Sequence, residues 1–225
     1  MIHWAAILGL LFVAGPVLHA GEVLDRIVVT VNGRAILESD LQDELRYECL
    51  AGGRPLQGLN SKDRKAALDR LIDQELLRQQ MSTADFKPAS PEEVDKQIET
   101  VKRDYARDRG GQSWSQALVS CGLTETDIMN HMVLELSQLR LVDAHLRPSV
   151  QVDPVAIEAY YRDHLAQLQS GAQQVSIQQA TPTIRELLTQ EKINQLLTSW
   201  LESLRSQAQI RTLVSDPSET QGPVQ

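Results

Sequence analysis

The chain has 225 residues, of which 42% are hydrophobic, 23% are charged and only 4% are aromatic. This length allows one sizeable domain or two small ones, and the composition excludes collagen-like and wholly disordered chains. The scarcity of aromatic residues argues against an all-β sandwich or barrel. The formal net charge of -8 excludes the basic surface that is typical of nucleic-acid-binding proteins. These numbers predict a mostly helical globular protein.

The first twenty residues have the character of an export signal. Residues 1–20 contain no Lys, Arg, Asp or Glu, and an almost entirely apolar run extends from Trp4 to Leu18. This run is shorter than the about 20 apolar residues that a membrane-spanning helix needs, and Gly15 and Pro16 interrupt it. We therefore expect residues 1–20 to be a secretory signal peptide that is cleaved, with an uncleaved anchor as the alternative.

Export would place the two cysteines, Cys49 and Cys121, in an oxidising compartment where a disulfide can form. The sequence does not determine whether their Cα atoms lie within bonding range. A disulfide between them and two separate buried thiols are therefore both open. The two cysteines form neither a Cys-x-x-Cys redox pair nor a metal-spaced cluster.

The clearest β signal lies near the start of the mature chain. Two apolar runs, residues 27–31 and 34–37, flank Asn32 and Gly33. An Asn-Gly pair favours a tight hairpin turn because both residues accept positive φ. A two-stranded hairpin is only marginally stable alone, and the other strand-like run is at residues 210–214. We predict that this C-terminal strand pairs with the N-terminal hairpin.

Helix start signals divide most of the remaining chain. Ser, Thr or Asp followed three residues later by an acidic residue or Gln is typical of a helix N-terminus. Such signals and the apolar periodicity predict helices that begin at or near Ser39, Ser61, Ser90, Trp114, Thr124, Asp153 and Thr183. Residues 169–183 are Gln-rich, contain Gly171 and Pro182, and are predicted to be a linker. Residues 215–225 are predicted to be a disordered tail.

No catalytic motif occurs in the sequence. The Gly-x-Ser-x-Gly elbow, the Walker loop and the dinucleotide-binding glycine motif are all absent. His131 and Glu135 lie four residues apart on one predicted helix and could supply two metal ligands, but a third and a fourth ligand are not apparent. We therefore predict no catalytic residue, no metal and no cofactor, and a protein that acts by binding.

The apolar helix stripes are candidates for both core and contact surface. Methionine adapts to varied partners, so large or Met side chains near the glycine-flanked centre of the chain are candidates for a binding cleft. These candidates are Tyr105, Trp114, Leu118, Met129 and Met132.

Several segments resemble the family of SurA-like periplasmic chaperones. Residues 27–41 read IVVTVNGRAILESDL and resemble the strand–turn–strand–helix opening of that family. Residues 70–77 (RLIDQELL) resemble its next helix, and residues 160–164 (YYRDH) resemble the segment before its isomerase domain. The C-terminal helix with Trp200 and the strand at 210–214 are similar to the family's C-terminal segment, which folds back onto the N-terminal domain.

The chain departs from the family where the parvulin isomerase domain would lie. A domain of about 90 residues has no room between Leu168 and Ile184, and the isomerase pocket residues have no matching positions. The residue patterns and the resemblance together predict a signal peptide (1–20), a SurA-type N-terminal helical domain (21–168), a linker in place of the isomerase domain (169–183), a C-terminal helix and strand (184–214), and a tail (215–225).

The resemblance implies an ATP-independent periplasmic chaperone that binds unfolded outer-membrane proteins or other extended polypeptides and prevents their aggregation. The five candidate cleft residues would then contact these clients. Two alternatives stay open: a degenerate peptidyl-prolyl isomerase with residual activity, and a fixed assembly partner in an envelope complex. We expect neither nucleic-acid binding nor stable membrane insertion after signal cleavage.

Overall fold

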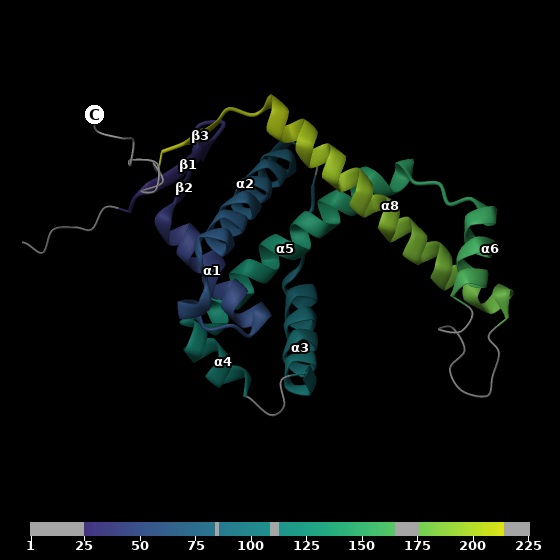
Figure 1. Ribbon diagram of the computed structural model, residues 1–225, viewed down its shortest axis with the longest axis horizontal. Coiled ribbons are helices and arrows are strands. Elements are labelled where there is room, and N and C mark those ends of the chain that lie inside the picture. The colour runs from purple at the N-terminus through teal and green to yellow at the C-terminus, as the bar shows by residue number, and fades with distance from the viewer. Residues whose placement is uncertain (1–24, 84–85, 109–112, 165–175, 214–225) are drawn as a thin grey trace, which may run out of the picture.

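The computed structural model describes residues 25–83, 86–108, 113–164 and 176–213. The predicted signal peptide (1–20), the first part of the predicted linker (169–175) and the predicted tail (215–225) lie outside these ranges. Most of the described chain is helical, with a small sheet at one end (Figure 1). The predicted fold class is confirmed.

The sheet is three-stranded and antiparallel, in the order β2-β1-β3. β1 (Ile27–Val31) and β2 (Arg34–Leu37) form the predicted hairpin, and Asn32 and Gly33 turn it with φ angles of 50° and 83°. β3 (Ile210–Thr212) pairs with the other edge of β1. The predicted completion of the hairpin by a C-terminal strand is confirmed, and it supplies the third strand that a marginal hairpin needs.

Helix α1 (Glu38–Gly52) begins earlier than predicted, because its N-cap is Leu37 and not Ser39. The Asp40 carboxylate accepts a hydrogen bond from the backbone N–H of Leu37 at 2.8 Å. Ser39 instead donates its hydroxyl and its backbone N–H to Asp25. An acidic side chain in the first turn thus replaces the predicted serine cap, and α1 follows β2 without a loop.

The next helices begin at or within a few residues of the predicted positions. They are α2 (Ser61–Thr83), α3 (Pro91–Asp108), α4 (Trp114–Cys121), α5 (Glu125–Leu146) and α6 (Pro154–Asp163), with short 3-10 turns η1 (Leu56–Gly58) and η2 (Arg147–Ser149). Thr124 and Asp127 form a capping box at α5, and Asp153 caps α6. Local sequence therefore determines these helix starts.

Helix α8 (Ile177–Gln207) starts before the predicted boundary near Thr183. Ser176 caps it, and Pro182 lies inside the helix and not at its end. A proline removes a backbone donor and disfavours a helix interior. Here Ile184, which is 0% exposed, packs against α6, and we attribute the continued helix to this burial.

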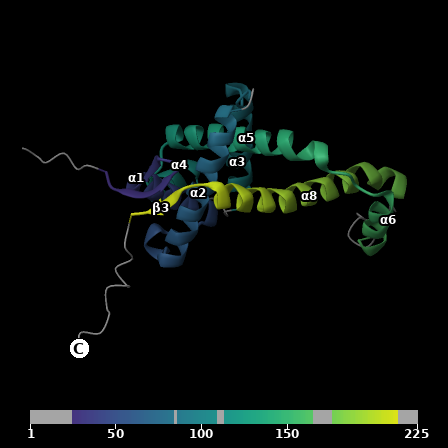
Figure 2. The same cartoon turned by 90° about the horizontal axis from the view of Figure 1, so that it is seen from above.

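Buried side chains form four clusters along the molecule. They lie between the sheet, α1 and α2, between α1, α3, α4 and α5, between α2, α5 and α8, and between α6 and α8. Figures 1 and 2 place α6 at the end of α8 that is remote from the sheet. We call α6 together with residues 177–188 of α8 the tip, and the sheet with α1–α5 the body.

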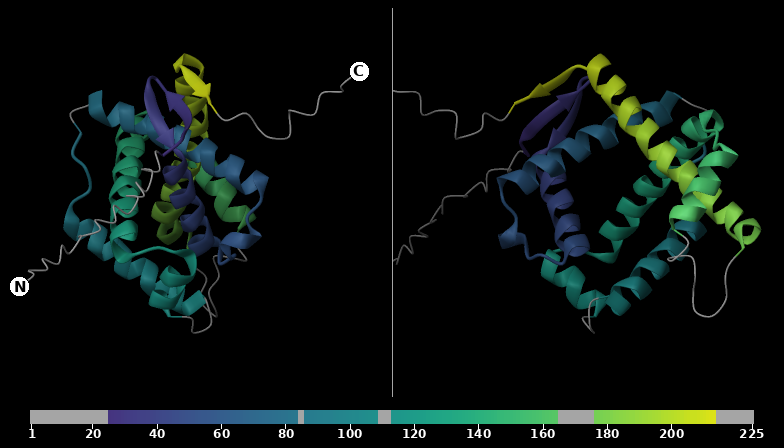
Figure 3. Two further views of the ribbon diagram at one scale, coloured as in Figure 1. Left: turned by 90° about the vertical axis from the view of Figure 1, so that its left-hand side faces the viewer. Right: turned by 45° about the vertical axis from the view of Figure 1, so that its right-hand side comes forward.

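Two arginines fix α8 to the rest of the molecule. Arg205 donates from Nε to Asp73 Oδ1 at 2.6 Å and from Nη2 to the backbone carbonyl of Asp69 at 2.7 Å, both on α2. Arg147, which follows α5, donates to the two carboxylate oxygens of Glu186 at 3.1 and 3.0 Å. Figure 3 shows α8 crossing the body beside the sheet and the helices.

Candidate functional site

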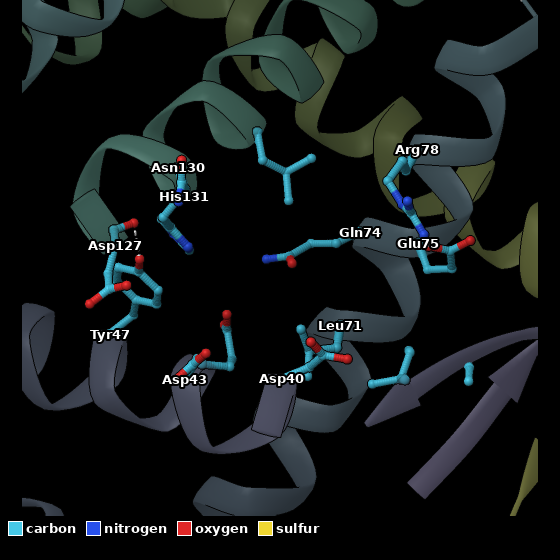
Figure 4. Close-up of a pocket in the computed structure, with 14 residues that line it drawn as sticks. Asp40, Asp43, Tyr47, Leu71, Gln74, Glu75, Arg78, Asp127, Asn130 and His131 are labelled. Atoms are coloured by element: carbon cyan, nitrogen blue, oxygen red, sulfur yellow. Dashed lines mark hydrogen bonds and ion pairs between the residues drawn. The ribbon is translucent and has the colours of Figure 1, made fainter. Parts of the chain in front are cut away.

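A cleft lies between α1, α2 and α5, beside β2, and has a volume of about 470 Å³ (Figure 4). A second hollow of about 270 Å³ between the same helices shares five lining residues with it: Glu44, Tyr47, Gln74, His131 and Leu134. We call the two together the α1–α2–α5 cleft. All of its lining residues fall between residues 35 and 138.

Each helix lines the cleft with one face, because residues three and four apart lie side by side on a helix. The faces consist of Asp40, Asp43, Glu44, Tyr47, Glu48 and Ala51 on α1, of Arg70, Leu71, Gln74, Glu75 and Arg78 on α2, and of Asp127, Asn130, His131, Leu134, Glu135 and Gln138 on α5. None of them was predicted as a contact residue, since the predictions followed apolar stripes. The signal that could have found them is a mainly polar face on each of the three helices, which recurs with the same helical period as an apolar stripe.

Tyr47 and His131 form a stacked wall of the cleft, with ring centroids 3.7 Å apart and ring planes inclined by 26°. The Tyr47 hydroxyl donates a hydrogen bond to the backbone carbonyl of Asp127. Burial raises the pKa of Tyr47, and the carboxylates of Asp127 and Asp43 raise it further. The phenol therefore stays protonated, and its hydrogen bond fixes the aromatic wall in place.

Two carboxylates of the cleft are buried and paired. Glu44 is 7% exposed and accepts from Arg70 Nε at 2.8 Å. Glu75 is 6% exposed and accepts from Arg78 Nε at 2.8 Å and from Gln79 Nε2 at 2.6 Å. Buried charges are costly unless they are paired, so these arginines have a structural role in keeping the two carboxylates in the cleft.

Other polar groups of the cleft are free to bind a ligand. Figure 4 shows the amide of Gln74 and the ring of His131 projecting into the cleft from α2 and α5. Among the described residues, neither the Gln74 amide nor the Asn130 amide has a hydrogen-bond partner. The Thr124 hydroxyl and backbone N–H lower the pKa of Asp127, which keeps this carboxylate ionised at the cleft wall.

The five predicted contact residues lie outside this cleft. Tyr105, Trp114, Leu118 and Met132 belong to the buried cluster between α1, α3, α4 and α5. Leu118 and Met132 are only 5% and 8% exposed, so in this fold they offer almost no surface to a ligand. Tyr105 and Trp114 are half-buried and meet edge to face, with ring centroids 5.6 Å apart. Met129 is 45% exposed on α5.

Cys49 of α1 and Cys121 of α4 form a disulfide, and their Cα atoms are 5.8 Å apart. Each residue is 3% exposed, and both lie in the same buried cluster as Leu118 and Met132. The bond therefore ties α1, which lines the cleft, to α4.

Within the described ranges, no group of three or more His, Cys, Asp or Glu side chains could hold a metal ion. His131 and Glu135, whose spacing suggested two possible ligands, have their Nε2 and Oε2 atoms 3.9 Å apart. In the same part of the chain, no helix combines the length and the apolar character needed to cross a membrane.

Comparison with known proteins gives one family match. The family described as SurA-like N-terminal domain matches residues 1–140. A solved structure from work on PEB4 and Cj1289, two structurally related SurA-like chaperones of Campylobacter jejuni, is similar at a TM-score of 0.47 and 12% sequence identity, covering 84% of this chain and 100% of that one. No curated protein matches the chain.

Proposed function

Because the chain belongs to the family of SurA-like N-terminal domains, we propose that it is an ATP-independent periplasmic chaperone. In this proposal it binds unfolded outer-membrane proteins and prevents their aggregation. The observation that carries the proposal is the α1–α2–α5 cleft, because every residue that lines it falls within the part of the chain that the family matches. Residues 1–20 would direct the export.

The lining of the cleft suits an extended polypeptide. Leu71 and Leu134 offer apolar contacts, and the free amides of Gln74 and Asn130 can bond to a client's backbone. Such contacts are individually weak and need no fixed client sequence. They allow release when the client folds elsewhere, and the sequence has no nucleotide-binding loop to drive release by hydrolysis.

The exposed side of α5 offers a second, apolar contact in this proposal. Met129 and Val133 are one helical turn apart and are 45% and 38% exposed. Among the five residues predicted from sequence, Met129 is the one whose side chain is exposed, whereas Tyr105 and Trp114 are half-buried and Leu118 and Met132 are buried. A flexible thioether of this kind adapts to varied clients.

We further infer that the chain does not catalyse prolyl isomerisation. Between the end of α6 at Asp163 and the start of α8 at Ile177 the chain is too short for a parvulin domain of about 90 residues. A protease-coupled assay with a proline peptide tests this inference. Turnover above the uncatalysed rate would favour the isomerase alternative.

The chaperone proposal is tested by diluting a urea-unfolded outer-membrane barrel protein into the mature chain and measuring binding and light scattering, with a folded protein as control. We expect micromolar binding and suppressed scattering. The variant Asn130→Trp, which adds a bulky side chain to the lining of the cleft, should weaken binding, whereas Gln195→Trp on the exposed face of α8 should not. Absence of binding by the wild-type chain would favour the fixed-partner alternative.

A further inference from the structure

The α1–α2–α5 cleft has a marked excess of negative charge. Seven carboxylates line it, from Asp40, Asp43, Glu44, Glu48, Glu75, Asp127 and Glu135, against the guanidinium groups of Arg70 and Arg78. Arg34 and Arg46 reach Glu75 and Asp43 from outside the lining. Even with these two cations included, the carboxylates exceed the arginines by three.

Two of these carboxylates, Asp40 and Asp127, form no ion pair within the described chain, although the charge of Arg46 also acts on Asp127. Asp40 is bound to the backbone N–H of Leu37, and Asp127 is bound to Thr124. Neither carboxylate lies within 4.0 Å of a Lys or Arg nitrogen of the described residues. The two come from different helices, Asp40 from α1 and Asp127 from α5, so a cation in the cleft would meet negative charge from both helices.

Other groups that line the cleft are suited to the backbone and the side-chain stem of a basic peptide segment. The unpaired Gln74 amide projects into the cleft and can accept from or donate to a peptide backbone (Figure 4). Leu71 and Leu134 line the same space and can pack on the methylene stem of a Lys or Arg side chain. The stacked face of Tyr47 and His131 offers a flat surface for a guanidinium plane or an aromatic ring.

We propose that the α1–α2–α5 cleft selects extended client segments that carry a Lys or Arg side chain. This inference rests on the proposed chaperone function and names the segment that the cleft binds. The cavity, the free Gln74 amide and the excess of carboxylates from α1, α2 and α5 carry it together. In this proposal the cleft binds the cationic side chain of the client. Met129 adds an apolar contact outside the cleft.

The test uses three fluorescent peptides of one extended sequence, with Lys, Gln or Glu at the central position, and measures their binding to the mature chain by anisotropy. We expect the Lys peptide to bind about tenfold more tightly than the Gln peptide, the scale of one charge-assisted hydrogen bond. The Glu peptide should bind more weakly still. The preference should decline with added salt, because the charges are partly solvated.

Charge reversal within the cleft supplies the control. Gln74→Lys and Asn130→Lys each place a cation in the cleft without removing a hydrogen bond of the fold, and both should abolish the preference for the Lys peptide. Gln195→Lys makes the same charge change at an exposed position of α8, and this variant should retain the preference for the Lys peptide. Equal binding of the three peptides by the wild-type chain would overturn the charge inference while leaving the chaperone proposal intact. Failure to bind both the peptides and the unfolded barrel protein would overturn both.

Discussion

Asn32 and Gln209 exchange two hydrogen bonds although 177 residues separate them in the chain. The backbone N–H of Asn32 donates to the carbonyl of Gln209 at 2.9 Å, and the backbone N–H of Gln209 donates to Asn32 Oδ1 at 2.8 Å. The Asn32 amide also donates to Gln79 Oε1 at 2.8 Å. One turn residue therefore joins the hairpin, the C-terminal segment and α2.

We expect Asn32→Gly to lower the free energy of unfolding by about 1 kcal/mol, because it keeps the turn but removes the side-chain hydrogen bonds. Asn32→Ala should cost about 1 kcal/mol more, since its φ of 50° disfavours alanine. Urea unfolding measures both. Gln209→Ala is the control, since Gln209 uses only its backbone here, and it should be nearly neutral. A large loss of unfolding free energy in Gln209→Ala would contradict the assignment of the stabilisation to the Asn32 side chain.

The disulfide between Cys49 and Cys121 gives a second prediction. It closes a sequence separation of 72 residues inside a buried cluster. Its reduction should lower the free energy of unfolding by about 2–5 kcal/mol, because the unfolded chain regains conformational freedom. Urea unfolding with and without a phosphine reductant measures this loss. The double variant Cys49→Ala/Cys121→Ala should be insensitive to the reductant, and an equal response of that variant would show that the reductant acts elsewhere.

Local signals in the sequence predicted most helix starts, and tertiary contacts account for the differences. Thr124 and Asp127 determine the start of α5 by bonding within one turn. By contrast, α8 continues through Pro182 because Ile184 is buried against α6, which is a contact between distant segments. The hairpin and its third strand were predictable because an isolated Asn-Gly hairpin needs a partner.

The candidate site could not be predicted in the same way. Its walls come from three helices, and each helix alone shows only a polar face, which is usually a solvated surface. Burial of Glu44 and Glu75 beside their arginines depends on the packing of α1 against α2. The predicted candidates Leu118 and Met132 were large and apolar, and that same property buries them around the disulfide.

The ion pair between Glu38 and Arg64 makes stability depend on acidity. Arg64 donates from Nη1 and Nη2 to the two carboxylate oxygens of Glu38 at 2.9 and 2.6 Å. These bonds, with smaller contributions from the Gln42 and Arg26 side chains, hold the pKa of Glu38 at about 2, below its ordinary 4.5. A lowered pKa in the folded state stabilises the protein fully above about pH 4.5, and this contribution disappears as the pH falls towards 2.

We therefore expect Arg64→Ala to lower the free energy of unfolding by about 1–2 kcal/mol at pH 7, with allowance for solvent screening. The difference from wild type should shrink between pH 4.5 and 2. Arg46→Ala is the matched control, because its ion pair with Asp43 is exposed and should contribute little. A difference for Arg64→Ala that stayed constant down to pH 2 would contradict the assigned pKa of Glu38.

The tip has its own small core, so we expect it to unfold without the body. Ile184 is 0% exposed and packs on Ile157 in a cluster separate from the other three. Ile184→Ala should cost about 2–4 kcal/mol at this site and accelerate amide hydrogen exchange in α6 and residues 177–188. Exchange in α1, α2 and α5, and client binding in the cleft, should not change, because local openings follow local cores. Ile193→Ala, between α5 and α8, is the contrasting control and should accelerate exchange in the body. Faster exchange throughout the body of Ile184→Ala would show instead that the tip and the cleft fold as one cooperative unit.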